Sequence, residues 1–243
     1  MEFIAEGMNF ILKEYLRGVK GGIPICLGYI SVSFAYGLMA TRGGMSLLSA
    51  VLISMTNMTS AGQVAGTDII LSNGSLVELA IATLIINIRY MLMSLSLSQR
   101  VEPSTGTVKR LIMSFGITDE IFALSMQRTH GISFRYFLGI MTLPYIGWSL
   151  GTFLGGFAGS ILPEFIRASL GIAIYAMFIA IIVPPARKSR PVLNVLLIAV
   201  AVSAALNLMS GILPISGGWK IIISTIIAAG IGAFLYPEKE ESV

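Results

Sequence analysis

Long stretches without a charged residue dominate the chain. Asp, Glu, Lys and Arg are absent from residues 21–41, 43–67, 136–163, 168–186, 191–219 and 221–237. A helix needs about 20 predominantly apolar residues to cross the hydrocarbon core of a bilayer, and most of these stretches are that long. The pattern predicts membrane-spanning helices at residues 22–41, 76–98, 134–158, 166–184, 192–212 and 219–236.

Two further segments, residues 47–71 and 110–127, are apolar but carry many polar side chains. The first is rich in Ser, Thr, Asn and Gln, and the second holds Asp119 and Glu120 near its centre. Each either crosses the membrane or enters and leaves on one side as a re-entrant or broken helix. We therefore predict an all-α fold, a polytopic membrane helical bundle with six to eight membrane segments.

The first 20 residues have the pattern of an amphipathic helix. Apolar residues recur there at the spacing of one helical face: Ile4, Met8, Ile11, Tyr15 and Val19. Charged residues occupy other positions, so the helix is expected to lie at the membrane surface. The predicted organisation is a surface helix over 1–20, a single transmembrane permease domain over 21–237 and a charged, solvated tail over 238–243.

Basic residues indicate how the chain is oriented. They cluster at 13–20, 100–110, 128–135 and 187–190, and the positive-inside rule places such loops in the cytoplasm. If both ambiguous segments are re-entrant, all four clusters and both termini are cytoplasmic. If both are full spans, the termini stay inside but the 100–110 cluster moves outside. The charge distribution favours re-entrant segments, whereas the length of 47–71 favours a span.

Composition agrees with a membrane protein and argues against other classes. Only 12% of residues are charged and 55% are hydrophobic, against about 25% charged in ordinary soluble domains. The net charge of +4 comes from basic residues at helix ends, without a basic stripe, so nucleic-acid binding is not expected. Cys26 is a lone cysteine and His130 stands in a basic loop, so no catalytic, metal or cofactor site is predicted and the protein is not expected to be an enzyme.

The most polar uncharged stretch inside an apolar run is residues 54–63. Polar groups at membrane depth must be satisfied within the protein or line a cavity. Two roles are open: hydrogen bonds that join helices, or the lining of a solute path. The density of polar groups and a helix break expected at Gly62 favour the second role. The candidate binding residues of this stretch are Asn57, Ser60, Gly62 and Gln63.

A charged residue stands in the middle of the helix predicted over 76–98. Arg89 has ten uncharged residues on each side, and a charge at helix centre costs about 2.5–3.5 kcal/mol on insertion scales. It therefore needs an aqueous pocket or an acidic partner, and Asp119 and Glu120 are the acids inside a membrane segment. We expect Arg89 to approach one of them, either as a structural ion pair or in a binding site that includes Asn87.

Glycines recur at every fourth position of the helix predicted over 134–158. Gly147, Gly151, Gly155 and Gly159 form a seam of small residues. Such a seam allows another helix to approach closely. The sequence leaves open whether that helix belongs to this chain or to a partner.

Four short motifs occur in a fixed order: a first span with Gly28, Phe34 and Gly37; the segment Ser54 to Gln63; Asn87-Ile88-Arg89-Tyr90; and Thr118-Asp119-Glu120. In these motifs, and in length and hydropathy, the chain resembles the AzlC-type branched-chain amino-acid export permeases, the larger subunit of a two-gene bacterial exporter. The resemblance implies a multi-pass protein of the bacterial cytoplasmic (inner) membrane. It also implies export of small hydrophobic amino acids from the cytoplasm and a small AzlD-type membrane subunit as partner.

A zwitterionic substrate needs an anion site, a cation site and an apolar pocket. Arg89, or a helix N-terminus near Gly62, offers the first, and Asp119 or Glu120 offers the second. Side chains for the apolar pocket are Met55, Met58 and Met91. The intramembrane acids leave coupling to the proton gradient open. The alternative function is a channel for a small solute or ion, lined by the same polar segments.

Both termini are predicted to be cytoplasmic, because the basic clusters at 13–20 and 187–190 both require it. Reporter fusions at Val243 and near residue 188 should give the cytoplasmic signal, and a fusion at Arg42 should give the external one as control. An external signal at Val243 would overturn the assignment.

Overall fold

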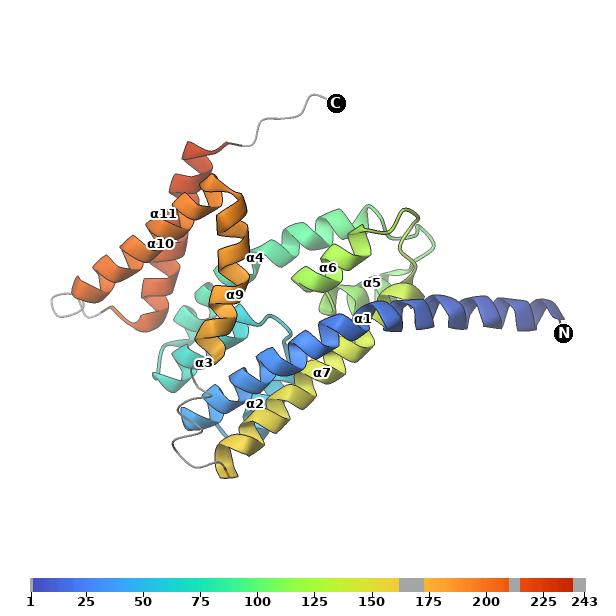
Figure 1. Cartoon of the computed structure of the whole chain (residues 1–243), viewed down its shortest axis with the longest axis horizontal. Helices are drawn as coiled ribbons and strands as arrows, with labels where there is room; N and C mark the ends of the chain where they lie inside the picture. The colour runs from blue at the N-terminus through green and yellow to red at the C-terminus, as the bar shows by residue number, and fades with distance from the viewer. Residues whose placement is uncertain (1, 162–172, 210–214, 238–243) are drawn as a thin grey trace. The chain divides into compact units, whose positions relative to one another are not determined.

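The computed structural model describes residues 2–161, 173–209 and 215–237, and nearly all of them are helical (Figure 1). The helices are α1 (Glu2–Arg42), α2 (Leu47–Thr56), α3 (Ala61–Leu71), α4 (Leu76–Ser98), α5 (Thr107–Phe115), α6 (Asp119–Met126), α7 (Phe134–Ile161), α9 (Ala173–Lys188), α10 (Arg190–Leu208) and α11 (Gly217–Leu235). In these ranges the only extended pairing is an isolated bridge between Val101 and Ile132. The predicted all-α class is confirmed.

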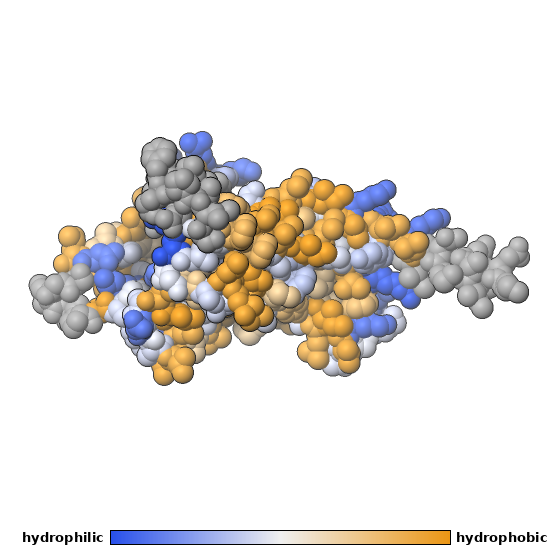
Figure 2. Space-filling model, turned by 90° about the horizontal axis from the view of Figure 1, so that it is seen from below, coloured by the Kyte–Doolittle hydropathy of each residue, from blue (hydrophilic) through white to orange (hydrophobic). Residues whose placement is uncertain are grey.

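Five helices among the described residues are long and apolar enough to cross a bilayer. They cover Leu12–Arg42, Leu76–Arg100, Phe134–Gly159, Arg190–Leu208 and Gly217–Leu235, and they match five of the predicted spans. The sixth, 166–184, lies partly outside the described residues and partly in α9. Many large apolar side chains are on the surface of the molecule (Figure 2). Exposed apolar surface of this extent marks membrane contact, so the chain is a multi-pass membrane protein.

Helix contacts divide the chain into two compact units. The first comprises residues 1–63 and 87–171, and the second comprises 64–86 and 172–243. The sequence predicted one domain over 21–237, whereas the packing groups these residues in two sets. The helix predicted at the N-terminus continues without a break into the first span as α1. The tail at 238–243 lies outside the described residues.

The first unit is built on the close pairing of α1 and α7, which lie side by side in Figure 1. A Cβ atom at Gly151 would overlap Ser33 and the backbone of Ile30, and one at Gly155 would overlap the carbonyl of Phe34. Small residues let two backbones touch. The glycine seam of α7 therefore faces a helix of this chain, which answers the question that the sequence left open.

The pairing of α1 with α7 is parallel. Gly18, in the middle part of α1, meets Tyr136 near the start of α7, and Gly37 further along α1 meets Thr152 further along α7. If both helices cross the membrane in one direction, the chain between them must cross back an odd number of times. The helix α4 supplies one crossing, so the two ambiguous segments must behave alike.

The segment around 110–127 enters and leaves on one side. The loops that precede α5 and follow α6 are bonded together: Ile132 N donates to Arg100 O at 2.8 Å, and Glu102 N donates to Ile132 O at 3.2 Å. The Arg100 guanidinium also donates to Arg128 O at 3.0 Å. Since both ends of the segment meet, α5 and α6 form a re-entrant pair of short helices.

The segment 47–71 is broken as well, between α2 and α3. Ser60 has a φ of 46°, and such left-handed geometry is uncommon outside glycine. The break therefore precedes Gly62, which corrects the prediction that Gly62 itself breaks the helix. Gly62 lies in the first turn of α3, where a Cβ would come within 2.6 Å of the Asn87 amide. Glycine is needed there for close packing between helices.

The helix α3 runs back along α4. Gly62 at its start faces Asn87, whereas Gly66 faces Thr83 and Leu79, earlier in α4. The two helices are therefore antiparallel, and α3 ends where α4 begins. Since the two ambiguous segments must behave alike and the ends of 110–127 meet, the segment 47–71 also returns to the side from which it started. This is the alternative that the charge distribution favoured.

In the second unit, the buried side chain of Glu78 joins α4 to α11. It is only 4% exposed, and its Oε1 accepts a hydrogen bond from Trp219 N at 3.1 Å and another from the Ser216 hydroxyl. A carboxylate at a helix N-terminus satisfies free N–H groups and interacts favourably with the helix dipole. Glu78 thus caps α11 from a distant part of the sequence.

Replacing a seam glycine should destabilise the first unit. Gly155→Leu forces a side chain into the backbone of α1, so it should lower the free energy of unfolding by about 3 kcal/mol or more. The measurement is thermal unfolding of the purified protein in detergent. Gly230→Leu is the matched control, because a Cβ there meets nothing within 4 Å. Equal unfolding temperatures for the two variants would contradict the assigned seam.

Candidate functional site

The two broken segments meet at Tyr29 of α1. From the α2–α3 break, Met58 packs against Tyr29 and Trp148 in a buried cluster, and the two aromatic rings contact edge-on at 5.2 Å between centroids. From the start of α6, Glu120 accepts a hydrogen bond from the Tyr29 hydroxyl at 2.6 Å. The Tyr29 oxygen also lies 2.6 Å from the Thr118 hydroxyl. One tyrosine therefore holds both breaks.

The predicted approach of Arg89 to an acid is confirmed. The Arg89 guanidinium contacts the Asp119 carboxylate at 2.8 Å, and the two side chains are 44% and 47% exposed. This is a half-exposed ion pair, and its geometry is compatible both with a structural role and with a binding site.

Adjacent side chains on a helix differ by about 100° in direction, and the two acids accordingly have different partners. Asp119 binds Arg89, whereas Glu120 binds Tyr29. Asp119 lies outside the five candidate spans. Partial burial raises the pKa of its carboxyl above the usual value, Arg89 opposes this rise, and the charge of Glu120 adds to it.

The motif Thr118-Asp119-Glu120 is the start of a helix. Thr118 is the N-cap of α6, and its hydroxyl accepts from Ile121 N at 3.4 Å. Both acids lie in the first turn, where negative charge interacts favourably with the helix dipole. The helix thus holds two carboxylates at the point where the segment changes direction.

Tyr90 links Arg89 to the other break. The Arg89 guanidinium lies 5.0 Å from the centre of the Tyr90 ring and donates to its hydroxyl at 3.3 Å. That hydroxyl lies 3.5 Å from Thr59 O. Tyr29 and Tyr90 were not among the site residues predicted from the sequence. Their signal is a phenolic hydroxyl inside an apolar run, which needs a polar partner.

The remaining candidates of the α2–α3 break shape the backbone. Asn57 Oδ1 accepts from Thr59 N at 3.2 Å and from the Thr59 hydroxyl at 2.7 Å, which fixes the turn. Ser60 has the left-handed backbone conformation at which the helix breaks. Asn87 packs its amide on Gly62, and its Oδ1 is buried without a hydrogen-bond partner among the described residues. Such an acceptor costs about 1–3 kcal/mol, so Asn87 is suited to receive a donor.

Gln63 differs from the other candidates because all its polar atoms are engaged. It is 2% exposed; Nε2 donates to Ser54 Oγ at 2.6 Å, and Oε1 accepts from Trp148 Nε1 at 3.1 Å. The Ser54 hydroxyl is also 2.7 Å from that of Thr152. This geometry favours the helix-joining role, since Gln63 connects α2, α3 and α7.

The three methionines considered for an apolar pocket have different surroundings. Met58 is 4% exposed and belongs to the core around Tyr29, whereas Met55 and Met91 are 41% and 64% exposed. Met58 is therefore placed to fill the core. Only Met55 and Met91 present a surface to a solute or to lipid.

Comparison with known proteins gives relatives over most of the chain. "Inner membrane protein YgaZ" of Escherichia coli is 30% identical over 183 residues, 72% of this chain and 75% of that protein. An "Uncharacterized membrane protein" of Archaeoglobus fulgidus is 30% identical over 70% of this chain and 75% of its own length. "Branched-chain amino acid transport protein AzlC" of Bacillus subtilis is 24% identical over 85% of this chain and 78% of its own length.

No solved structure matches the chain. The AzlC protein family matches residues 24–162, a range that contains both broken segments, the ion pair and both tyrosines. With this match and the relatives of similar length, the chain belongs to the AzlC family.

Proposed function

We propose that this chain is the permease subunit of an exporter of small hydrophobic amino acids in the bacterial cytoplasmic (inner) membrane. The observation that carries the proposal is the half-exposed pair of Arg89 and Asp119, located where two broken helices meet. Broken helices at membrane depth supply polar groups for solute binding in many transporters. The family relationship indicates a transporter rather than an enzyme, and the relative in Bacillus subtilis is named for branched-chain amino acid transport.

A zwitterion is the solute that suits an ion pair. Its carboxylate binds Arg89 as a charge-assisted hydrogen-bond acceptor, and its ammonium group takes the place of the guanidinium beside Asp119. The exchange leaves the net charge of the site unchanged, which limits its cost in a low-dielectric environment. At the α2–α3 break, the unpartnered Asn87 Oδ1 is available to a donor, and the start of α3 at Ala61 adds a positive dipole for the carboxylate.

The aliphatic side chain of the substrate needs an apolar contact. Met55 and Met91 have exposed side chains, and the flexible thioether adapts to branched chains of different shape. We assign them to this contact. Ser60, Asn57 and Gly62 hold the backbone of the break in place, and Gln63 fixes the break against α7.

Coupling to the proton gradient is assigned to Glu120. Its carboxylate is bound to the Tyr29 hydroxyl, apart from the pair that receives the substrate. Protonation of Glu120 weakens its bond to Tyr29 and so links proton uptake to the contact between α1 and α6. A small AzlD-type membrane subunit completes the proposed transporter.

Export against a gradient is the direct test. Cells loaded with a leucine-containing dipeptide should release leucine until its external concentration exceeds the internal one when this gene and that of the small subunit are both present. Cells without this gene should retain it. Release that stops at equal concentrations would indicate a channel and overturn the proposal.

Removing the charges of the ion pair distinguishes a role in substrate binding from a role in stabilising the fold. Arg89→Gln and Asp119→Asn each remove a charged hydrogen-bond partner worth about 1.5–3 kcal/mol, so initial efflux should fall at least about tenfold. The double variant Arg89→Gln/Asp119→Asn removes both charges together. It should insert and stay folded yet remain inactive, because the substrate has lost both anchors. Recovered efflux in the double variant would show that the pair only stabilises the fold.

A further inference from the structure

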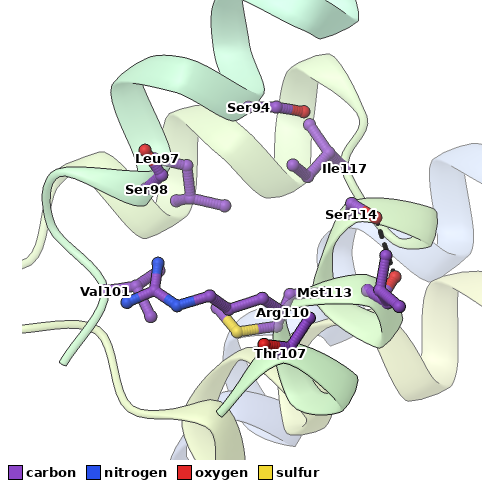
Figure 3. Close-up of a pocket in the computed structure, with 10 residues that line it drawn as sticks. Ser94, Leu97, Ser98, Val101, Thr107, Arg110, Met113, Ser114 and Ile117 are labelled. Carbon is purple, nitrogen blue, oxygen red and sulfur yellow. Dashed lines mark hydrogen bonds between the residues drawn. The ribbon is translucent and has the colours of Figure 1, made fainter. Parts of the chain in front are cut away.

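An apolar cavity lies between the end of α4 and α5, within the first unit and apart from the ion pair (Figure 3). Its volume is about 270 Å³. Leu97, Val101, Met113 and Ile117 supply its apolar wall. Water gains few hydrogen bonds against such a wall, whereas a hydrocarbon chain is well accommodated.

Two of the hydroxyl groups that line the cavity are bonded within their own helix. Ser114 donates to Leu111 O at 2.7 Å, the bond marked in Figure 3. Ser98 likewise donates to Leu95 O at 2.8 Å. A serine hydroxyl that donates to a carbonyl of its own helix has no further O–H to donate to a ligand. The cavity therefore presents mainly carbon to a ligand.

One cation extends across this cavity. Figure 3 shows the Arg110 side chain reaching from α5 towards Val101. Its Nε donates to Thr105 O at 3.0 Å, and no acid contributes to the cavity lining. Within the described ranges, Arg110 also forms no ion pair. Its two terminal nitrogens are thus available to an anion, for which a guanidinium is well shaped.

The charge of the cavity decides the class of ligand. A zwitterionic amino acid needs an acid for its ammonium group, and the lining has none. A molecule with an anionic head and a hydrocarbon tail satisfies both the guanidinium and the apolar wall. The site therefore differs in chemistry from the Arg89–Asp119 pair.

The outer face of α5 indicates the source of that molecule. Val108, Leu111 and Phe115 are 71%, 65% and 43% exposed, and Lys109 and Arg110 lie on the same short helix. Amphipathic helices with basic residues lie at the membrane interface and attract anionic lipids. We propose that this cavity binds an anionic phospholipid, with its phosphate at Arg110 and an acyl chain between α4 and α5.

Native mass spectrometry of the full chain in detergent tests the proposal. The protein is titrated with phosphatidylglycerol, with phosphatidylcholine as the zwitterionic comparison. Arg110→Gln should weaken phosphatidylglycerol binding roughly fivefold and leave phosphatidylcholine binding unchanged. Lys109→Gln is the matched control: Lys109 is the neighbouring cation, does not line the cavity, and lies 5.8 Å from the Phe134 ring centre. It should weaken phosphatidylglycerol binding less than Arg110→Gln does, because Lys109 lies outside the cavity.

A second variant tests the tail without changing charge. Ser98→Leu places a larger apolar side chain in the cavity and should also reduce phosphatidylglycerol binding. If Arg110→Gln does not fold, the proposal is tested with this variant. Equal loss in Arg110→Gln and Lys109→Gln would show unspecific attraction and overturn the site. Displacement of the lipid by glycerol 3-phosphate would show an anion site without a tail, and displacement by leucine would show a substrate site. Either displacement overturns the lipid assignment.

Discussion

The direct backbone contact between α1 and α7 is the constraint on which the first unit depends. Glycines on both helices remove the side chains that would separate them, so carbonyl groups of one helix touch the backbone of the other. In a bilayer, lipid tails are as apolar as leucine, and helices associate through close packing and hydrogen bonds. This contact places Tyr29 of α1 opposite Trp148 of α7, and both broken segments are attached there.

Broken helices are tolerated at membrane depth only where the protein satisfies their polar groups. The α2–α3 break is held by Gln63, which bonds to Ser54 and to Trp148. The start of α6 is held by Tyr29 through Thr118 and Glu120. The paired helices α1 and α7 thus supply hydrogen-bond partners to both broken segments. Arg89 and Asp119 remain half exposed.

The adjacent acids show how local helix geometry creates two sites from one motif. The turn of the helix separates their directions, so Asp119 reaches the charge on α4 and Glu120 reaches the hydroxyl on α1. The motif therefore contributes to two separate contacts, an ion pair and a hydrogen bond. Since both contacts lie on the first turn of α6, a movement of that short helix changes them together.

The sequence by itself determined five of the spans and the need of Arg89 for an acidic partner or an aqueous pocket. These follow from hydropathy and charge, because burial of each charge in lipid has a cost that its sequence position already reveals. The tertiary structure decided that Asp119, not Glu120, pairs with Arg89 and that the glycine seam faces α1. It also placed the break at Ser60 ahead of Gly62, and it assigned Gln63 to the helix contacts. These contacts depend on which helix faces approach each other. The sequence of one helical segment does not specify which neighbouring helix it will contact.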